Sequence, residues 1–111
     1  MSDPVEQAFQ ELRLEYLVSL PARLEELRSD LASRRAGDQT VDASLKVRIH
    51  RLAGSGGSYG FTHLSSLARD AERWLANHPT AGEQGELEMI VDRLAQAATD
   101  AEVEVRKRVR G

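Results

Sequence analysis

The residues best suited to chemistry in this sequence lie close together in the stretch IHRLAGSGGSYGF, residues 49–61. It carries one histidine, His50, followed within two turns by Gly54, Gly56 and Gly57. An exposed imidazole is a nucleophile near neutral pH, because it is then largely uncharged and one ring nitrogen keeps a free lone pair. Each glycine costs a helix interior about 1 kcal/mol relative to alanine. If the stretch is helical, some other interaction must offset the cost of its three glycines.

Apolar residues at helical spacing predict that the stretch does belong to a helix. One face of this helix is defined by Leu45, Ile49, Leu52, Gly56 and Tyr59, which we expect to face the core. On a helical wheel of about 100° per residue, His50 lies about 140° from Leu45 and points outward. Gly56 on the core face would let a neighbouring helix come close.

The other two glycines are predicted to clear space around the histidine. Gly54 and Gly57 stand at i+4 and i+7 from His50, where side chains would otherwise flank the imidazole. With Val47 and Ala53 they predict an open apolar surface on which another protein could dock. A flexible loop with an incidental surface histidine is the alternative interpretation.

The rest of the chain predicts helices that position this one. A short helix starts at Pro4 and is interrupted at Pro21, because proline lacks a backbone N–H. A leucine stripe predicts a second helix from there to Gly37. Two further apolar stripes predict helices over residues 62–77 and from Thr80 to the C-terminus.

These elements predict an all-α fold, an antiparallel four-helix bundle with a short N-terminal capping helix. The length of 111 residues fits a single domain over residues 1–111. A formal net charge of −3 with mixed signs argues against a nucleic-acid partner. The sequence has no apolar run near the roughly 20 residues that span a bilayer, and no signal-peptide pattern. We expect a cytoplasmic protein without membrane contact, and a monomer.

A family signature matches the histidine stretch. Residues 50–55 read HRLAGS and are followed by Gly60 and Phe61. This pattern resembles the H-x-L-x-G-S signature of histidine-containing phosphotransfer (HPt) domains, the carriers of two-component phosphorelays. The flanking segments YLVSLPARLEEL and LSSLARDAE resemble the helices of the same family. The resemblance implies that Nε2 of His50 takes a phosphoryl group from a receiver-domain aspartate and later passes it to another receiver.

One position departs from the family pattern. The family often has lysine three residues after the histidine, where this chain has Ala53. The lifetime of the phosphohistidine is therefore open. Lys46, at i−4 from His50, lies on the right face to supply a positive charge, whereas Arg51 points away by about 100°.

The second ring nitrogen of the histidine needs a partner that fixes its proton. Counting back from the turn near Gly60 in an antiparallel pair sets His50 beside residues 69–73 of the next helix. We therefore expect Glu72 to orient the ring, with Arg69 or Arg73 nearby. Solvated charges that serve no such purpose are the alternative.

The stretch GSGGSYG, residues 54–60, has neither the lysine of a Walker motif nor the spacing of a kinase glycine loop. We expect a phosphocarrier without a nucleotide site, and neither a cofactor nor a metal site. His63 and His78 lie at opposite ends of one predicted helix and are expected to be turn and surface residues. The resemblance implies that the receiver partner brings Mg²⁺.

The expected partners are receiver domains of response regulators or of hybrid histidine kinases. Two alternatives remain open. The chain could be the detached phosphoacceptor module of a chemotaxis-type histidine kinase, with a kinase as donor. It could also be a non-phosphorylated adaptor that binds a receiver or kinase, although an adaptor has no need of a nucleophile with a cleared flank. The sequence leaves the donor, the acceptor, the pathway and the direction of transfer undetermined.

Overall fold

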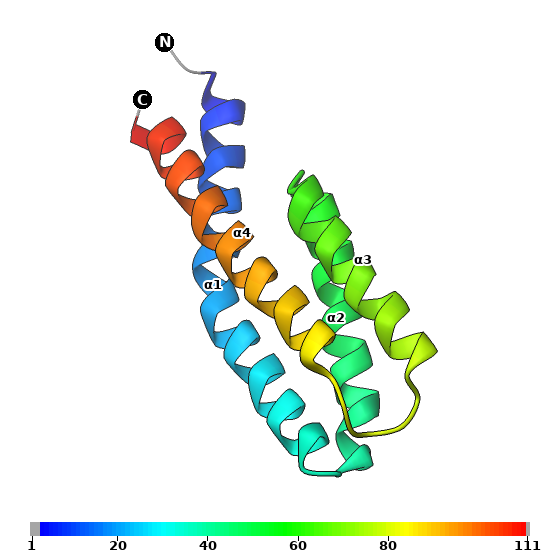
Figure 1. The fold of residues 1–111 in the computed structure, drawn as a ribbon. Helices are drawn as coiled ribbons and strands as arrows, with labels where there is room; N and C mark the ends of the chain where they lie inside the picture. The colour runs from blue at the N-terminus through cyan, green and yellow to red at the C-terminus, as the bar shows by residue number, and fades with distance from the viewer. Residues whose placement is uncertain (1–2, 111) are drawn as a thin grey trace.

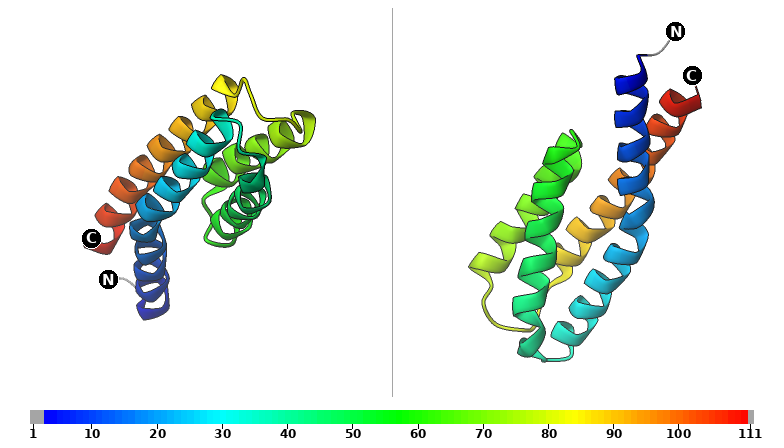
Figure 2. Two further views of the ribbon diagram at one scale, coloured as in Figure 1. Left: turned by 90° about the horizontal axis from the view of Figure 1, so that it is seen from below. Right: turned by 180° about the vertical axis from the view of Figure 1, so that it is seen from behind.

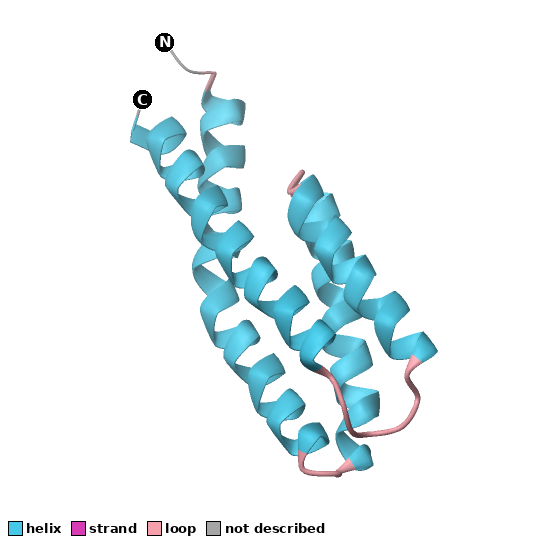
Figure 3. Ribbon diagram, in the orientation of Figure 1, coloured by secondary structure: helices cyan, strands magenta, loops and turns pink. Residues whose placement is uncertain are grey.

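Helices make up most of residues 3–110, the part of the chain that this computed structural model describes (Figures 1 and 3). No strand occurs within that range. The helices are α1 (Pro4–Arg35), α2 (Asp42–Ser58), α3 (Thr62–Asn77) and α4 (Gly85–Arg110), and a short 3-10 helix, η1 (Gln39–Val41), precedes α2. The predicted all-α class is confirmed.

The first helix starts as predicted but is not divided. The Asp3 carboxylate accepts a hydrogen bond from the Val5 amide at 2.8 Å, and Pro4 occupies the first turn. The predicted break at Pro21 is wrong, because this residue lies inside a helix of 32 residues. Residues 3–35 therefore contain no separate capping helix.

Packing explains why α1 continues through its proline. Pro21 is exposed, whereas Leu17, Leu20 and Leu24 on either side of it are buried. This continuous buried face outweighs the single intrahelical hydrogen bond that proline removes. Figure 2 shows α1 changing direction partway along its length, as helices containing proline commonly do.

The four helices pack in a closed ring. Each helix contacts its neighbours in the sequence, and α1 also packs against α4. The result is an elongated bundle with extents of 54 × 19 × 18 Å. The ends of α1 and α4 run past the turn between α2 and α3, so both described ends of the chain lie at one end of the bundle (Figures 1 and 2).

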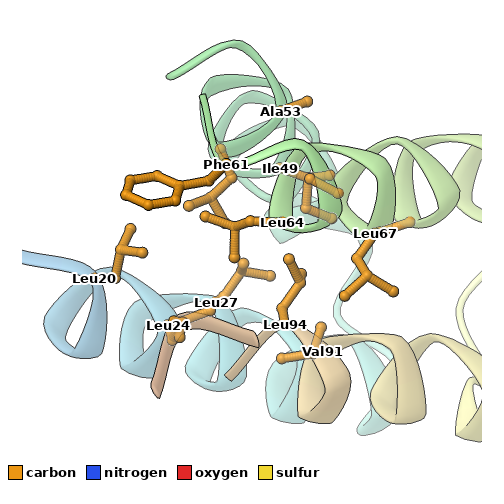
Figure 4. Close-up of a cluster of buried hydrophobic side chains, with 14 of the residues drawn as sticks. Leu20, Leu24, Leu27, Ile49, Ala53, Phe61, Leu64, Leu67, Val91 and Leu94 are labelled. Carbon is orange, nitrogen blue, oxygen red and sulfur yellow. The ribbon is translucent and has the colours of Figure 1, made fainter. Parts of the chain in front are cut away.

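The core lies between the helices and draws leucine, isoleucine and valine from all four. Fully buried examples are Leu20, Leu27, Ile49, Val91 and Leu94, and Figure 4 shows such side chains pointing into a shared space. Removing this apolar surface from water is the main source of stability for the bundle. The residues predicted to line the inner face of α2 are buried, except that Tyr59 is only partly so.

A buried arginine holds the loop between α3 and α4. The Arg34 side chain is inaccessible to solvent, and its Nη2 donates to the carbonyls of His78 at 2.6 Å and Thr80 at 3.0 Å. Its Nη1 donates to Gln84 Oε1 at 3.2 Å. The anchored loop continues to Gln84, and the last helix begins at Gly85 rather than directly after Thr80 as predicted.

None of the helices within residues 3–110 has both the length and the apolar composition needed to cross a membrane.

Candidate functional site

His50 stands in the middle of α2 and points away from the core. Its neighbours Ile49 and Leu52 are buried, whereas 78% of the His50 side chain is accessible to solvent. The outward orientation predicted from the helical wheel is thus present. An imidazole in this position can be reached by a large partner without any movement of the helix.

The Glu72 carboxylate lies beside the imidazole. Nδ1 of His50 is 2.9 Å from Oε2 of Glu72, which comes from the adjacent antiparallel helix α3. A carboxylate only accepts hydrogen bonds, so a neutral imidazole in this pair carries its proton on Nδ1. The lone pair of Nε2 is then left free on a side chain that is mostly accessible.

The glycines of α2 allow this helix to lie close to α3. A Cβ atom on the buried Gly56 would stand 3.4 Å from both the Leu64 side chain and the Ser65 amide nitrogen. Ser65 also donates through its hydroxyl to the Ala53 carbonyl at 2.7 Å. The predicted close approach at Gly56 is confirmed, and it brings Glu72 within reach of the histidine.

The two remaining glycines differ from each other. A Cβ atom on Gly54 would meet nothing within 4 Å, so this position is open surface next to the histidine. A Cβ atom on Gly57 would lie 3.4 Å from the Ser65 hydroxyl, although the residue itself is exposed. Open space beside His50 is therefore clearest at Gly54, while Gly57 borders α3.

Ala53 does not belong to the exposed surface, and the prediction that it helps to form a docking face is wrong. Only 3% of the residue is accessible, because it lies on the side of α2 that packs against α3. Val47, by contrast, is 47% exposed. On α2, the apolar surface available around the histidine is formed by Val47 and the glycines.

An open groove of about 530 Å³ runs along the histidine between α2 and α3. Its lining is Lys46, Val47, His50, Arg51, Glu72, Leu75 and Ala76. Leu75 and Ala76 were not predicted, although they follow Glu72 by one helical turn and so share its side of α3. Much of the groove is apolar, which suits contact with the side chains of another protein.

Two cationic side chains border this groove. Lys46 lies there as predicted, and Arg51 also lines it although the wheel directs its Cβ away from His50. Neither forms an ion pair with another residue of the described chain. Arg69 is exposed and does not line the groove, and Arg73 pairs with Asp70 on its own helix.

The other two histidines have different surroundings. The His78 ring stacks on Trp74 with centroids 3.9 Å apart, and its Nδ1 lies 2.8 Å from the Trp74 carbonyl. His63 is exposed at the start of α3. Residues 3–110 contain no group of three or more side chains suited to holding a metal ion. His50 alone combines a mid-helix position with a carboxylate on one nitrogen.

The sequence matches one known protein family over the region that contains His50 and Glu72. The sequence model described as "Hpt domain" matches residues 11–103, which is most of the chain. The chain belongs to the Hpt domain family. Hpt domains are phosphotransfer modules of two-component signalling, act as phosphocarriers without a nucleotide site, and interact with receiver domains. No curated protein and no solved structure matches this Hpt domain.

The matched range includes every residue of the groove and the whole of α2 and α3. It stops short of the first turns of α1 and the last turns of α4. The exposed histidine of this Hpt domain and its partner Glu72 therefore lie in the part that the family shares, and the two protruding ends lie outside it.

Proposed function

We propose that this Hpt domain accepts a phosphoryl group on Nε2 of His50 from a receiver-domain aspartate and passes it to another receiver. The observation that carries the proposal is the exposed imidazole with Glu72 at 2.9 Å from its Nδ1. A carboxylate in that position favours the tautomer in which Nε2 is the nucleophile. It also pairs with the positive charge that the ring gains when Nε2 bonds to phosphorus.

The transfer step conserves atoms and charge with these groups. The Nε2 lone pair attacks the phosphorus of the aspartyl phosphate, and the bond from phosphorus to the aspartate oxygen breaks. The aspartate leaves as a carboxylate, and the imidazole becomes a phosphorylated cation whose Nδ1 proton stays hydrogen-bonded to Glu72. Attack by the aspartate of a second receiver reverses each of these changes.

The negative charge of the transferred phosphoryl group would be stabilised by cations from both proteins. Lys46 lines the groove one turn from His50 and has no competing ion pair, so its ammonium group is free to approach the phosphoryl oxygens. Arg51 borders the same groove and is a second candidate, while Arg69 is better suited to the rim of the contact. Mg²⁺ is expected to arrive bound to the receiver.

The surface around the histidine suits a reversible contact. Val47 and Ala76 supply exposed apolar area in the groove, Leu75 lines it from beneath, and the bare position at Gly54 lets a partner surface approach the ring. The receiver's acidic site would be drawn by the cations at the edge of this surface. We include Gly57 in the contact because it is exposed one further turn along α2.

Label transfer from a phosphorylated receiver domain tests the proposal. The wild-type protein should take up acid-labile label, and His50→Gln should take up none. His63→Gln is the matched control, since it removes an exposed histidine of α3 and should leave transfer unchanged. Uptake from a kinase with ATP, but not from any phospho-receiver, would favour the chemotaxis-type alternative. Receiver binding without label in the wild type would favour the adaptor.

A further inference from the structure

The protruding ends of α1 and α4 form a two-helix unit that we call the terminal hairpin, residues 4–16 and 98–110. Neither α2 nor α3 accompanies its outer turns (Figures 1 and 2). Gln7 Nε2 donates to the Val109 carbonyl at 3.4 Å. This contact defines the register between the two helices, with residue 7 level with residue 109. The family match, residues 11–103, leaves both tips out. The tips therefore need an explanation outside the shared Hpt fold.

An apolar stripe on α1 is left uncovered there. Val5, Phe9 and Leu12 follow each other at helical spacing and are 76%, 41% and 51% exposed. The next residue in the stripe, Tyr16, is buried and stacks on Tyr59 at the end of α2, with ring centroids 4.6 Å apart. The exposed stripe thus continues the face of α1 that α2 covers lower in the bundle. A contiguous exposed apolar stripe of this kind is typical of an interface.

The adjoining face of α4 carries charges of both signs. Glu104 and Arg108 continue, at helical spacing, a line of small residues on α4, Ala97 and Ala101, that pack against the core. Burial, and then the charge of Arg108, lower the pKa of Arg13, so the Arg108 charge lies near Arg13. The uncovered face therefore combines an apolar stripe with a pattern of fixed charges.

We propose that two copies of this chain associate through their terminal hairpins, face to face and antiparallel, about a two-fold axis perpendicular to the helices. In this arrangement α1 packs on the α1 helix of the second copy, so the stripe of Val5, Phe9 and Leu12 is buried against its own counterpart. The two hairpins together then form a second four-helix bundle. We expected a monomer from the sequence, and this surface argues against that prediction.

Charged residues on α1 and on α4 can both form opposite-charge pairs across the same two-fold axis. An axis midway between residues 9 and 10 sets Glu6 opposite Arg13 of the partner subunit. On α4, an axis at residue 106 sets Glu104 opposite Arg108 of the partner subunit. Counting from the contact of Gln7 with Val109 puts residues 9 and 10 level with residues 107 and 106. One axis, to within a residue, thus creates opposite-charge pairs on both helices.

The length of the hairpin fits the same arrangement. With this axis, the partner's α1 starts opposite Glu15, next to Tyr16 and the end of α2. Arg13 Nε donates to the Tyr59 carbonyl at 2.9 Å, so the first turn of the partner's α1 would lie beside the turn between α2 and α3, and the overlap ends there. About ten residues of each helix overlap, roughly 15 Å, so we expect a small interface and a reversible dimer. His50 lies outside the contact, and the proposal is independent of phosphoryl transfer.

Sedimentation equilibrium over a range of protein concentrations tests this association. The mass of the wild-type chain should rise with concentration from that of one chain toward that of two. Phe9→Asp puts a charge in the apolar stripe and should hold the mass at one chain. Val103→Asp is the control, because Val103 is half exposed and lies on the other side of α4 from the buried Val105. It should associate like the wild type.

A charge exchange tests the register. Glu104→Arg alone and Arg108→Glu alone should each weaken association, since each creates like-charged pairs across the axis. Combining both substitutions restores opposite charges and should recover association. A wild-type mass that stays at one chain up to millimolar concentration would overturn the proposal. So would a dimer that Phe9→Asp leaves intact, or a double variant that associates no better than either single one.

Discussion

His50 and Glu72, 22 residues apart in the chain, meet across the interface of α2 and α3 with Nδ1 2.9 Å from Oε2. The turn at Tyr59–Phe61 reverses the chain between them, and Gly60 in that turn has φ +81°, a conformation that favours glycine. Gly56 lets the two helices approach closely enough for the contact. The pair decides which ring nitrogen is protonated and which is free.

Glu72→Ala should slow phosphoryl transfer without unfolding the protein. The contact is largely exposed, so its loss is worth at most about 1 kcal/mol, roughly a fivefold change in rate. Nitrogen-15 chemical shifts of the imidazole should show less of the tautomer protonated on Nδ1. Glu72→Gln should keep part of the effect, because its carbonyl oxygen still accepts a hydrogen bond. Unchanged shifts and rate in the alanine variant would remove Glu72 from the mechanism.

Leucine substitutions should separate the roles of two glycines. Gly54→Leu meets open space and should raise stability by up to about 1 kcal/mol, yet slow transfer by obstructing the ring. Gly56→Leu faces Leu64 and the backbone of Ser65, and should cost about 1–3 kcal/mol through overpacking. Urea unfolding and transfer rates measure both effects. Normal transfer by Gly54→Leu would show that the partner does not approach over this position.

Val47→Asp should weaken receiver binding by placing a charge in the apolar part of the groove. Because Val47 is 47% exposed, the fold should be retained. Val18→Asp is the matched control, since Val18 is a similarly exposed valine on α1 and away from the groove. Titration of a receiver into each variant should show reduced affinity for Val47→Asp only. Equal affinity in the two variants would move the docking surface elsewhere.

Arg34→Ala should destabilise the protein by about 3 kcal/mol or more, because it removes a fully buried side chain together with its hydrogen bonds and leaves a cavity. The groups affected are the carbonyls of His78 and Thr80, and Asp42, which accepts from Arg34 Nε at 3.0 Å. Arg28→Ala breaks only an exposed pair with Asp92 and should cost less than about 1 kcal/mol. Urea unfolding compares the two. A similar small loss in both would show that the loop does not depend on Arg34.

Periodicity was sufficient to predict the helices and the side of α2 on which His50 stands. The same counting predicted Glu72, because an antiparallel pair joined by a tight turn fixes which residues lie at one level. Local rules failed at Pro21, where burial of leucines on both sides decided the outcome. Proline rules describe an isolated helix and do not include the packing that carries α1 through this position.

Tertiary contacts explain the other errors. A helical wheel places Ala53 on the outer face, but the close approach at Gly56 extends the buried interface over it. The environment of Arg34 depends on carbonyls more than 40 residues away, which no local pattern signals. Arg51 reaches the groove through the length of its side chain, whereas a wheel locates only its Cβ.

The position of the phosphoryl group on the protein is the most direct test of the proposed function. The protein is phosphorylated by a phospho-receiver and examined by NMR for coupling between phosphorus and nitrogen-15 of the imidazole. We expect one phosphorylated residue, His50, with phosphorus bonded to Nε2 and the proton retained on Nδ1. A phosphoryl group on Nδ1 of His50, on His63 or on His78 would contradict it.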